Sequence, residues 1–108
     1  MSETNAVTRA IIDYIHALGG MAWRNNTGAM RKPYIDKRGD TREHFIPFGE
    51  KGSGDVLALH RGVFYSIEVK TGRDKLRPSQ EQWIERVNER GGVAFVARDI
   101  DDVMERIR

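Results

Sequence analysis

The sequence lacks cysteine altogether, in a chain of 108 residues. This absence excludes disulfide bonds, thiolate zinc sites and a cysteine nucleophile, and it fits a reducing compartment, so a cytoplasmic location is expected. Long hydrophobic runs are also missing. None approaches the roughly 20 residues that cross a bilayer, and no signal peptide is recognisable, so no membrane partner is expected. A chain of this length supports one hydrophobic core, which predicts a single domain over residues 1–108.

A strong charge of either sign is absent as well. Eighteen Lys and Arg residues face 16 Asp and Glu residues, giving a formal net charge of +2. Such a balance permits nucleic-acid binding without requiring it. The basic residues of the middle segment could face phosphates or could form a solvated loop of mixed charge, and they are Arg24, Arg31, Lys32, Lys37, Arg38, Arg42 and Lys51.

The hydrophobic periodicity predicts alternating helices and strands. Between residues 28 and 54 the pattern is least regular, with a hairpin tip at 37–40 and one strand at 44–48. The helix before residue 93 supplies a crossover, so the strands on either side of it are expected to be parallel. The predicted order is a helix at 3–18, strands at 21–24, 44–48, 55–59 and 63–70, a helix from 78 or 79 to 90, a strand at 93–97 and a last helix.

Several local features accompany this pattern. Ser2 is a candidate N-cap for the first helix, and Ser79 with Gln82 fits a capping box for the second. Trp23 and Trp83 are expected in the core. The last helix begins after Asp99 or Asp101 and is expected to turn Ile100, Val103, Met104 and Ile107 inward.

Two carboxylates and a lysine are the main candidates for chemistry. Glu68 and Lys70 lie two residues apart on one strand, so they project from the same face. A turn at residues 60–62 would bring Asp55 onto the neighbouring strand. Two carboxylates beside an ammonium group form a plausible divalent-metal site for phosphodiester hydrolysis. The alternative is an ordinary polar strand face in water.

The segments around these residues resemble a known nuclease family. Gly52-Ser53-Gly54-Asp55 followed by Ile67-Glu68-Val69-Lys70 is similar to the signature of the PD-(D/E)XK nuclease superfamily. The wider pattern resembles its VRR-NUC branch, whose compact stand-alone members are typical of phage and bacterial genomes. A proline usually precedes the first aspartate, and Gly54 stands there instead. The further matching segments are Glu3, Trp23–Gly28, Leu76–Trp83 and Gly91–Val96.

The resemblance implies a fold and a set of roles. The implied fold is α/β, a restriction-endonuclease-like three-layer core with a central mixed sheet flanked by helices. Asp55 and Glu68 would bind Mg²⁺ or Mn²⁺ together with the Val69 carbonyl, and Lys70 would act on the attacking water and the phosphate. Gln80 would lie near the active site, although it could instead satisfy a local backbone group. Glu3 would reach the metal, although a glutamate at a helix start is also favoured by the helix dipole.

The implied activity is a metal-dependent endonuclease that cuts DNA, with Holliday-junction or flap-like substrates selected by their shape. Stand-alone members resemble junction resolvases, which act as dimers, so a homodimer is expected. The alternatives are a non-catalytic nucleic-acid-binding module and a subunit of a larger nuclease complex. Candidate phosphate contacts, each equally compatible with a solvated surface charge, are Arg24, Arg31, Lys32, Arg73, Lys75 and Arg77.

Overall fold

The structure is a computed structural model that describes residues 2–108. Its elements are α1 (Glu3–Ala17), β1 (Met21–Arg24), β2 (Gly28–Ile35), β3 (Thr41–Phe48), β4 (Val56–His60), β5 (Val63–Val69), α2 (Pro78–Glu89), β6 (Val93–Ala97) and α3 (Ile100–Arg106).

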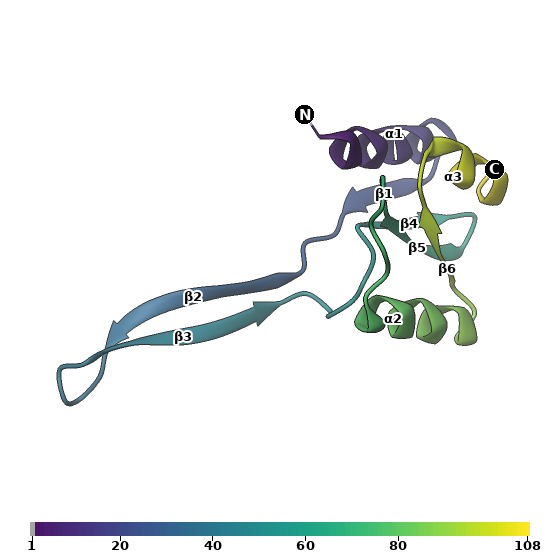
Figure 1. The fold of residues 1–108 in the computed structure, drawn as a ribbon. Helices are drawn as coiled ribbons and strands as arrows, with labels where there is room; N and C mark the ends of the chain where they lie inside the picture. The colour runs from purple at the N-terminus through teal and green to yellow at the C-terminus, as the bar shows by residue number, and fades with distance from the viewer. Residues whose placement is uncertain (1) are drawn as a thin grey trace.

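A four-stranded mixed sheet forms the centre of the molecule, in the order β1-β4-β5-β6. Strand β4 is antiparallel to both β1 and β5. Strand β6 runs parallel to β5, because α2 carries the chain back across the sheet between them. Helices α1 and α3 cover one face and α2 covers the other (Figure 1). The predicted three-layer α/β core and the parallel pair are therefore confirmed.

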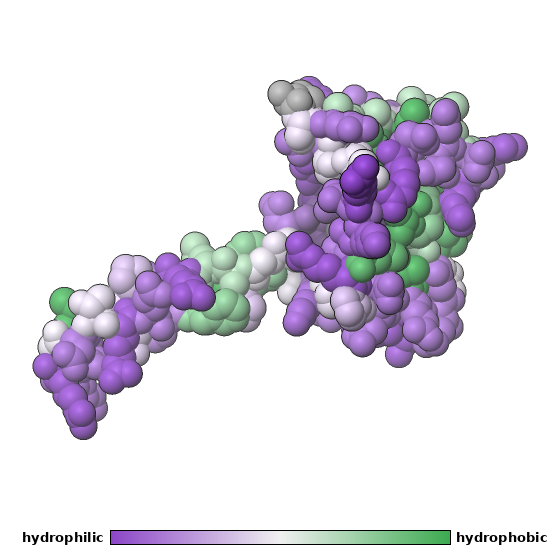
Figure 2. All heavy atoms as spheres, in the orientation of Figure 1, coloured by the Kyte–Doolittle hydropathy of each residue, from purple (hydrophilic) through white to green (hydrophobic). Residues whose placement is uncertain are grey.

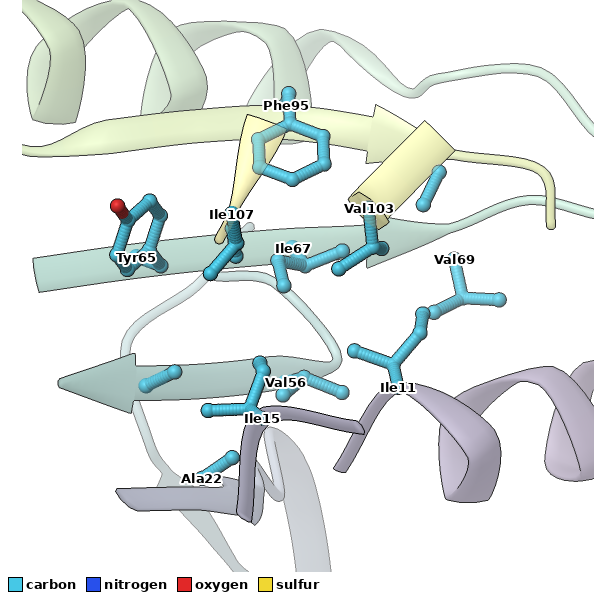
Figure 3. Packing of buried hydrophobic residues seen from close by; sticks show 12 residues of the cluster. Ile11, Ile15, Ala22, Val56, Tyr65, Ile67, Val69, Phe95, Val103 and Ile107 are labelled. Carbon is cyan, nitrogen blue, oxygen red and sulfur yellow. The ribbon is translucent and has the colours of Figure 1, made fainter. Parts of the chain in front are cut away.

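The hydrophobic core lies between the sheet and the pair α1 and α3 (Figure 3). Burying one of these aliphatic side chains contributes roughly 1.5–3 kcal/mol, so this layer holds the sheet in place. Ser2 caps α1 and Asp99 caps α3, as the sequence indicated. The core residues are Ile11, Ile15, Ala22, Val56, Ala58, Tyr65, Ile67, Val69, Phe95, Ala97, Val103 and Ile107.

A two-residue turn joins β4 to β5. His60 pairs with Val63, and the intervening Arg61 and Gly62 both have positive φ angles, 52° and 79°. This combination is that of a type I′ turn, whose twist matches that of the flanking strands. The turn fixes the register of the hairpin and therefore decides which side chains share a face.

A long hairpin, residues 28–48, extends away from this body, and we call it the arm (Figure 1). Strands β2 and β3 pair only with each other, and every residue in them is exposed. The radius of gyration is consequently 17.0 Å, against about 13 Å for a compact chain of this length. The sequence predicted the tip and the second strand but not β2, because a strand exposed on both faces has no alternating pattern.

The arm is divided along its length. Its half nearest the body is apolar and its outer half is mainly polar (Figure 2). An ion pair joins Arg42 Nε to Asp36 Oδ2 at 2.6 Å, and Tyr34 stacks on His44. The exposed large apolar side chains of the arm are Met30, Tyr34, Ile35, Phe45, Ile46 and Phe48.

Three local expectations were wrong. Trp23 and Met104 are each 44% exposed and lie outside the core. The N-cap of α2 is Arg77, not Ser79, and its backbone amide donates to Gln80 Oε1 at 2.9 Å.

Within residues 2–108, no helix is both long enough and apolar enough to cross a membrane.

Candidate active site

The β4–β5 hairpin brings the two carboxylates together. Val56 pairs with Ile67, and continuing this register by one residue sets Asp55 opposite Glu68 on the same face. Directly opposed residues of an antiparallel pair have Cβ atoms about 4.5–5.5 Å apart. The structure therefore places the two predicted metal ligands side by side at the open end of the hairpin.

Helix α2 covers the face of β5 that carries the polar side chains. Glu68 is only 4% exposed and Lys70 only 9% exposed, so the alternative of a polar face in water is wrong. Gln80 Nε2 donates to Glu68 Oε1 at 3.0 Å, and Lys70 Nζ lies 3.7 Å from the same oxygen. Gln80 thus contacts the site directly, in agreement with the position predicted for it.

Burial governs the charge of Glu68. The pKa of the Glu68 carboxyl is raised from its ordinary 4.5 to about 8, chiefly by desolvation and also by the neighbouring Asp55 carboxylate, while Lys70 acts in the opposite direction. When both carboxyls are ionised, the buried Glu68 and the half-buried Asp55 carry one more negative charge than Lys70 balances. Hard oxygen donors in such a place fit Mg²⁺ or Mn²⁺.

The backbone of Val69 faces Asp55. The Val69 amide donates to Asp55 Oδ2 at 2.8 Å, which fixes the orientation of this carboxylate. In strand conformation the carbonyl of a residue lies on the same edge as its amide. The Val69 carbonyl therefore lies on the edge of β5 that faces Asp55, where a third oxygen donor is available.

Asn25 organises the loop that leads to Asp55. Its Nδ2 donates to Ser53 Oγ at 2.6 Å and to the Gly54 carbonyl at 2.9 Å. Its backbone amide donates to the carbonyl of Asp55 at 2.9 Å. Asn25 received no role of its own in the sequence analysis. The one signal that could have pointed to it is that it lies in the segment Trp23–Gly28, which resembles the nuclease family.

Gly54 is enclosed from two sides. A Cβ added there would lie 2.7 Å from Ser66 Oγ and 2.8 Å from the carbonyl oxygen of Ile67. Ser66 Oγ accepts from the Gly54 amide and from Trp83 Nε1, so helix α2 is tied to the same point. The absence of a side chain at residue 54 is thus what lets the loop approach β5 next to Asp55.

The segment after Lys70 is held by a residue that the sequence did not single out. Arg98 donates to three backbone carbonyls, those of Lys70 and Gly72 at 3.4 Å each and that of Asp74 at 3.1 Å. Thr4 and Thr71 contact each other through their hydroxyls at 2.6 Å, which ties the start of α1 to the same segment. No local sequence signal marks Arg98, because its partners are backbone atoms remote in the chain.

Glu3 is exposed in the first turn of α1. Within residues 2–108, no three or more His, Cys, Asp or Glu side chains are grouped so that they could hold a metal ion. Asp55 and Glu68 therefore stand as a pair in this structure, and a role of Glu3 as a ligand stays a prediction.

A cleft of about 530 Å³ opens beside the carboxylates and runs to the base of the arm. Of the six candidate phosphate contacts only Arg77 lines it, together with Lys51, one of the middle-segment basic residues that could face phosphates. Arg31 and Lys32 lie on the arm, where Arg31 pairs with Glu43 at 3.6 Å. Arg24, Arg73 and Lys75 are exposed around the body. The cleft is lined by Thr27, Gly28, Ala29, Phe45, Pro47, Phe48, Gly49, Lys51, Gly52, Ser53, Asp55, Glu68, Arg77, Ser79 and Gln80.

Comparisons with known proteins identify the family and the fold. The family model described as "VRR-NUC domain" matches residues 10–99, a stretch that contains Asp55, Glu68, Lys70 and Gln80. Among solved structures, a chain titled "VRR_NUC domain" is similar over 100% of both chains, with a TM-score of 0.67 and 25% sequence identity. No curated protein matches the sequence.

Proposed function

The chain belongs to the VRR-NUC domain family, and from this membership we propose that it is a divalent-metal-dependent endonuclease acting on DNA. The observation that carries the proposal is the pairing of the half-buried Asp55 with the buried Glu68, with Lys70 and Gln80 both directed at Glu68 Oε1. A family name supports nuclease chemistry in general. The arrangement of these four side chains supports hydrolysis of a phosphodiester bond by this chain.

Asp55, Glu68 and the Val69 carbonyl are the groups that would hold Mg²⁺ or Mn²⁺. When bound, such an ion offsets the charge of the scissile phosphate and lowers the pKa of a water molecule. The Val69 amide keeps Asp55 oriented, and Gln80 does the same for Glu68. Orienting contacts of this kind keep ligands in place between turnovers.

Lys70 supplies a positively charged ammonium group at the proposed reacting centre. Its ammonium group is nearly buried and lies 3.7 Å from Glu68, so its long side chain is held at the reacting centre. We assign it to orienting or deprotonating the attacking water and to offsetting charge on the phosphate. Arg77 and Lys51, on the walls of the cleft, would bind neighbouring phosphates of the strand.

The proposed substrate class is branched DNA, either junctions or flaps. The body offers little surface for reading base edges, because it is small and helices α1 and α3 cover one whole face of its sheet. Selection by the shape of the nucleic acid needs only a cleft and phosphate contacts at intervals.

We extend the proposal to a homodimer, since cutting two strands of a junction symmetrically takes two sites. The support is a pair of apolar side chains on one face of the arm. Met30 pairs with Ile46, and they remain 55% and 39% exposed. A second copy that covered them would remove this apolar surface from water.

The decisive experiment incubates the protein with labelled junction, flap and linear duplex DNA in Mg²⁺ or Mn²⁺. Cleavage of the branched substrates is expected, with a loss of at least 100-fold in Asp55→Ala and Lys70→Ala, in the range that removal of a charge-stabilising group produces. Asp13→Ala, an exposed change on α1, is the matched control. Absence of cleavage by the wild-type protein, or undiminished cleavage by Asp55→Ala, would contradict the proposal.

A further inference from the structure

The cleft has two chemically different walls. One carries the carboxylates, Gln80 and the basic side chain of Arg77; the other is apolar and belongs to the base of the arm. Three residues of the arm that share one strand face, Ala29, Pro47 and Phe45, line it, and Phe48 completes it at the end of β3. Nothing in the proposed hydrolysis uses this second wall.

Phe45 is the residue of this wall with the least support from the protein. Its side chain is 67% exposed, and its cross-strand partner is Arg31, whose side chain is 74% exposed. Phe48, by contrast, is 44% exposed and its ring packs over Gly28, where an added Cβ would lie 3.4 Å from the ring. A phenyl ring left this open to water beside a charged site is positioned to contact a ligand.

The ligand must combine an anionic part with a flat apolar part. The carboxylate wall, with a cation bound and with Lys51 and Arg77 nearby, suits a phosphate, and the phenyl ring suits a π-face. A nucleotide carries both parts in one unit. In a paired duplex the base faces are covered by stacking, so only an unpaired or splayed base can present its face to Phe45.

We propose that Phe45 is a stacking platform for an unpaired nucleobase next to the scissile phosphate. This inference rests on the proposed nuclease function and specifies its substrate: a strand with at least one unstacked nucleotide at the cut site. The residue would thereby act in selecting substrate, since fully paired DNA cannot make this contact.

A binding experiment separates this inference from catalysis. The probe is a short single strand that contains 2-aminopurine, titrated with protein in EDTA while fluorescence is recorded. Stacking on Phe45 is expected to quench the probe, and Phe45→Ala is expected to weaken binding about tenfold, the order found for loss of one base-stacking aromatic. Phe45→Trp should restore the quench, and Ile35→Ala should leave it unchanged, because Ile35 shares the strand face but lies outside the cleft.

A cleavage experiment then tests selectivity. With Mg²⁺, Phe45→Ala is expected to slow cutting of a flap about tenfold and to leave cutting of a nicked, fully paired duplex unchanged. An equal loss on both substrates, or no loss on either, overturns the inference. So does a change in sedimentation coefficient in Phe45→Ala, which would place Phe45 at a contact between copies.

The two proposals fail in different ways. A wild-type protein that cuts nothing, yet shows quenching that depends on Phe45, would overturn the nuclease proposal and support the nucleobase contact. If the wild-type protein cuts branched DNA and Phe45→Ala cuts it equally well, the nuclease proposal would be supported and the nucleobase contact overturned.

Discussion

At the scale of a single residue, the burial of Glu68 favours its neutral carboxyl form, whereas the proposed role as a metal ligand requires the carboxylate. In the metal-free protein the Glu68 carboxyl is mostly neutral at physiological pH, because its pKa is raised to about 8 by burial and by Asp55, against the effect of Lys70. Asp55, Lys70 and Gln80 surround this carboxyl, and either a proton or a bound cation would offset the second negative charge of the carboxylate pair. The metal ion proposed above would therefore compete with a proton for Glu68.

The first prediction concerns this carboxyl in metal-free protein. The folded state binds the proton more tightly than the unfolded state, where the ordinary value is 4.5, so the stabilisation is complete below about pH 4.5 and is lost as pH rises towards about 8. In EDTA, the free energy of unfolding of the wild type should fall relative to that of Glu68→Gln across this window. Urea denaturation at several pH values measures both proteins. Parallel pH profiles of the two would contradict the prediction.

The second prediction concerns Arg98, which holds the segment after Lys70 through three carbonyls. Arg98→Lys keeps the charge but loses the planar fork that reaches them together. Amide hydrogen exchange across residues 71–74 should become faster, and cleavage should slow severalfold because Lys70 is less well positioned. Arg90→Lys, a change at an exposed side chain on the far end of α2, is the control. Unchanged exchange in Arg98→Lys would show that the segment is held by other contacts.

At the scale of elements, the site is a junction of a hairpin, a loop and a helix. The loop before Asp55 is fastened to β5 through Ser66, and Ser66 also receives the indole of Trp83 from α2. Any change that separates loop from strand should therefore also displace the helix that carries Gln80.

The third prediction tests that coupling. Gly54→Ala places a methyl group 2.8 Å from the Ile67 carbonyl oxygen, so loop and strand must move apart. A decrease of about 1–3 kcal/mol in the free energy of unfolding is expected, as for overpacked sites, together with loss of cleavage. Gly39→Asn, at the open tip of the arm with φ +85°, should cost less than 1 kcal/mol, since Asn tolerates this backbone region. Equal decreases in the free energy of unfolding for Gly54→Ala and Gly39→Asn would contradict this prediction.

Elements with one buried face were predictable from the sequence. Val63, Tyr65, Ile67 and Val69 alternate with a face that holds Ser66, Glu68 and Lys70, and this predicted both β5 and the common face of Glu68 and Lys70. The alternating pattern could not show that α2 would cover the face of β5 that carries Glu68 and Lys70. That covering depends on how Trp83 and Gln80 of α2 contact Ser66 and Glu68. The residue types alone likewise suggested a capping box at Ser79, whereas Gln80 serves both the Arg77 amide and Glu68.

The whole molecule consists of a packed body and an arm that contributes nothing to the core. None of the core residues lies in 28–48, and an isolated two-stranded hairpin is marginally stable in water. Such an exposed sheet is consistent with the contacts proposed above, with nucleic acid at Phe45 and with a second copy at Met30 and Ile46.

The fourth prediction removes the arm. Replacing residues 30–46 by Asn-Gly joins Ala29 to Pro47, which are cross-strand partners, through a favoured two-residue turn. The shortened chain should fold as a monomer with a thermal midpoint within a few degrees of the wild type. Its radius of gyration by X-ray scattering should be about 13 Å, below the 17.0 Å of a single chain with the arm. Calorimetry should still detect Mn²⁺ binding that depends on Asp55. An unfolded or aggregated product would show that the body needs the arm.

The two-residue turn between β4 and β5 also bears on the order of events during folding. Asp55 and Glu68 are joined by the shortest connection in the central sheet, whereas β5 and β6 can pair only after the whole crossover through α2 has been arranged. Contacts close in sequence form fastest, because little chain entropy is lost in closing them. The carboxylate pair is therefore expected to come together among the first tertiary contacts of the chain, so that two like charges meet before the lysine segment is anchored and the helix covers them.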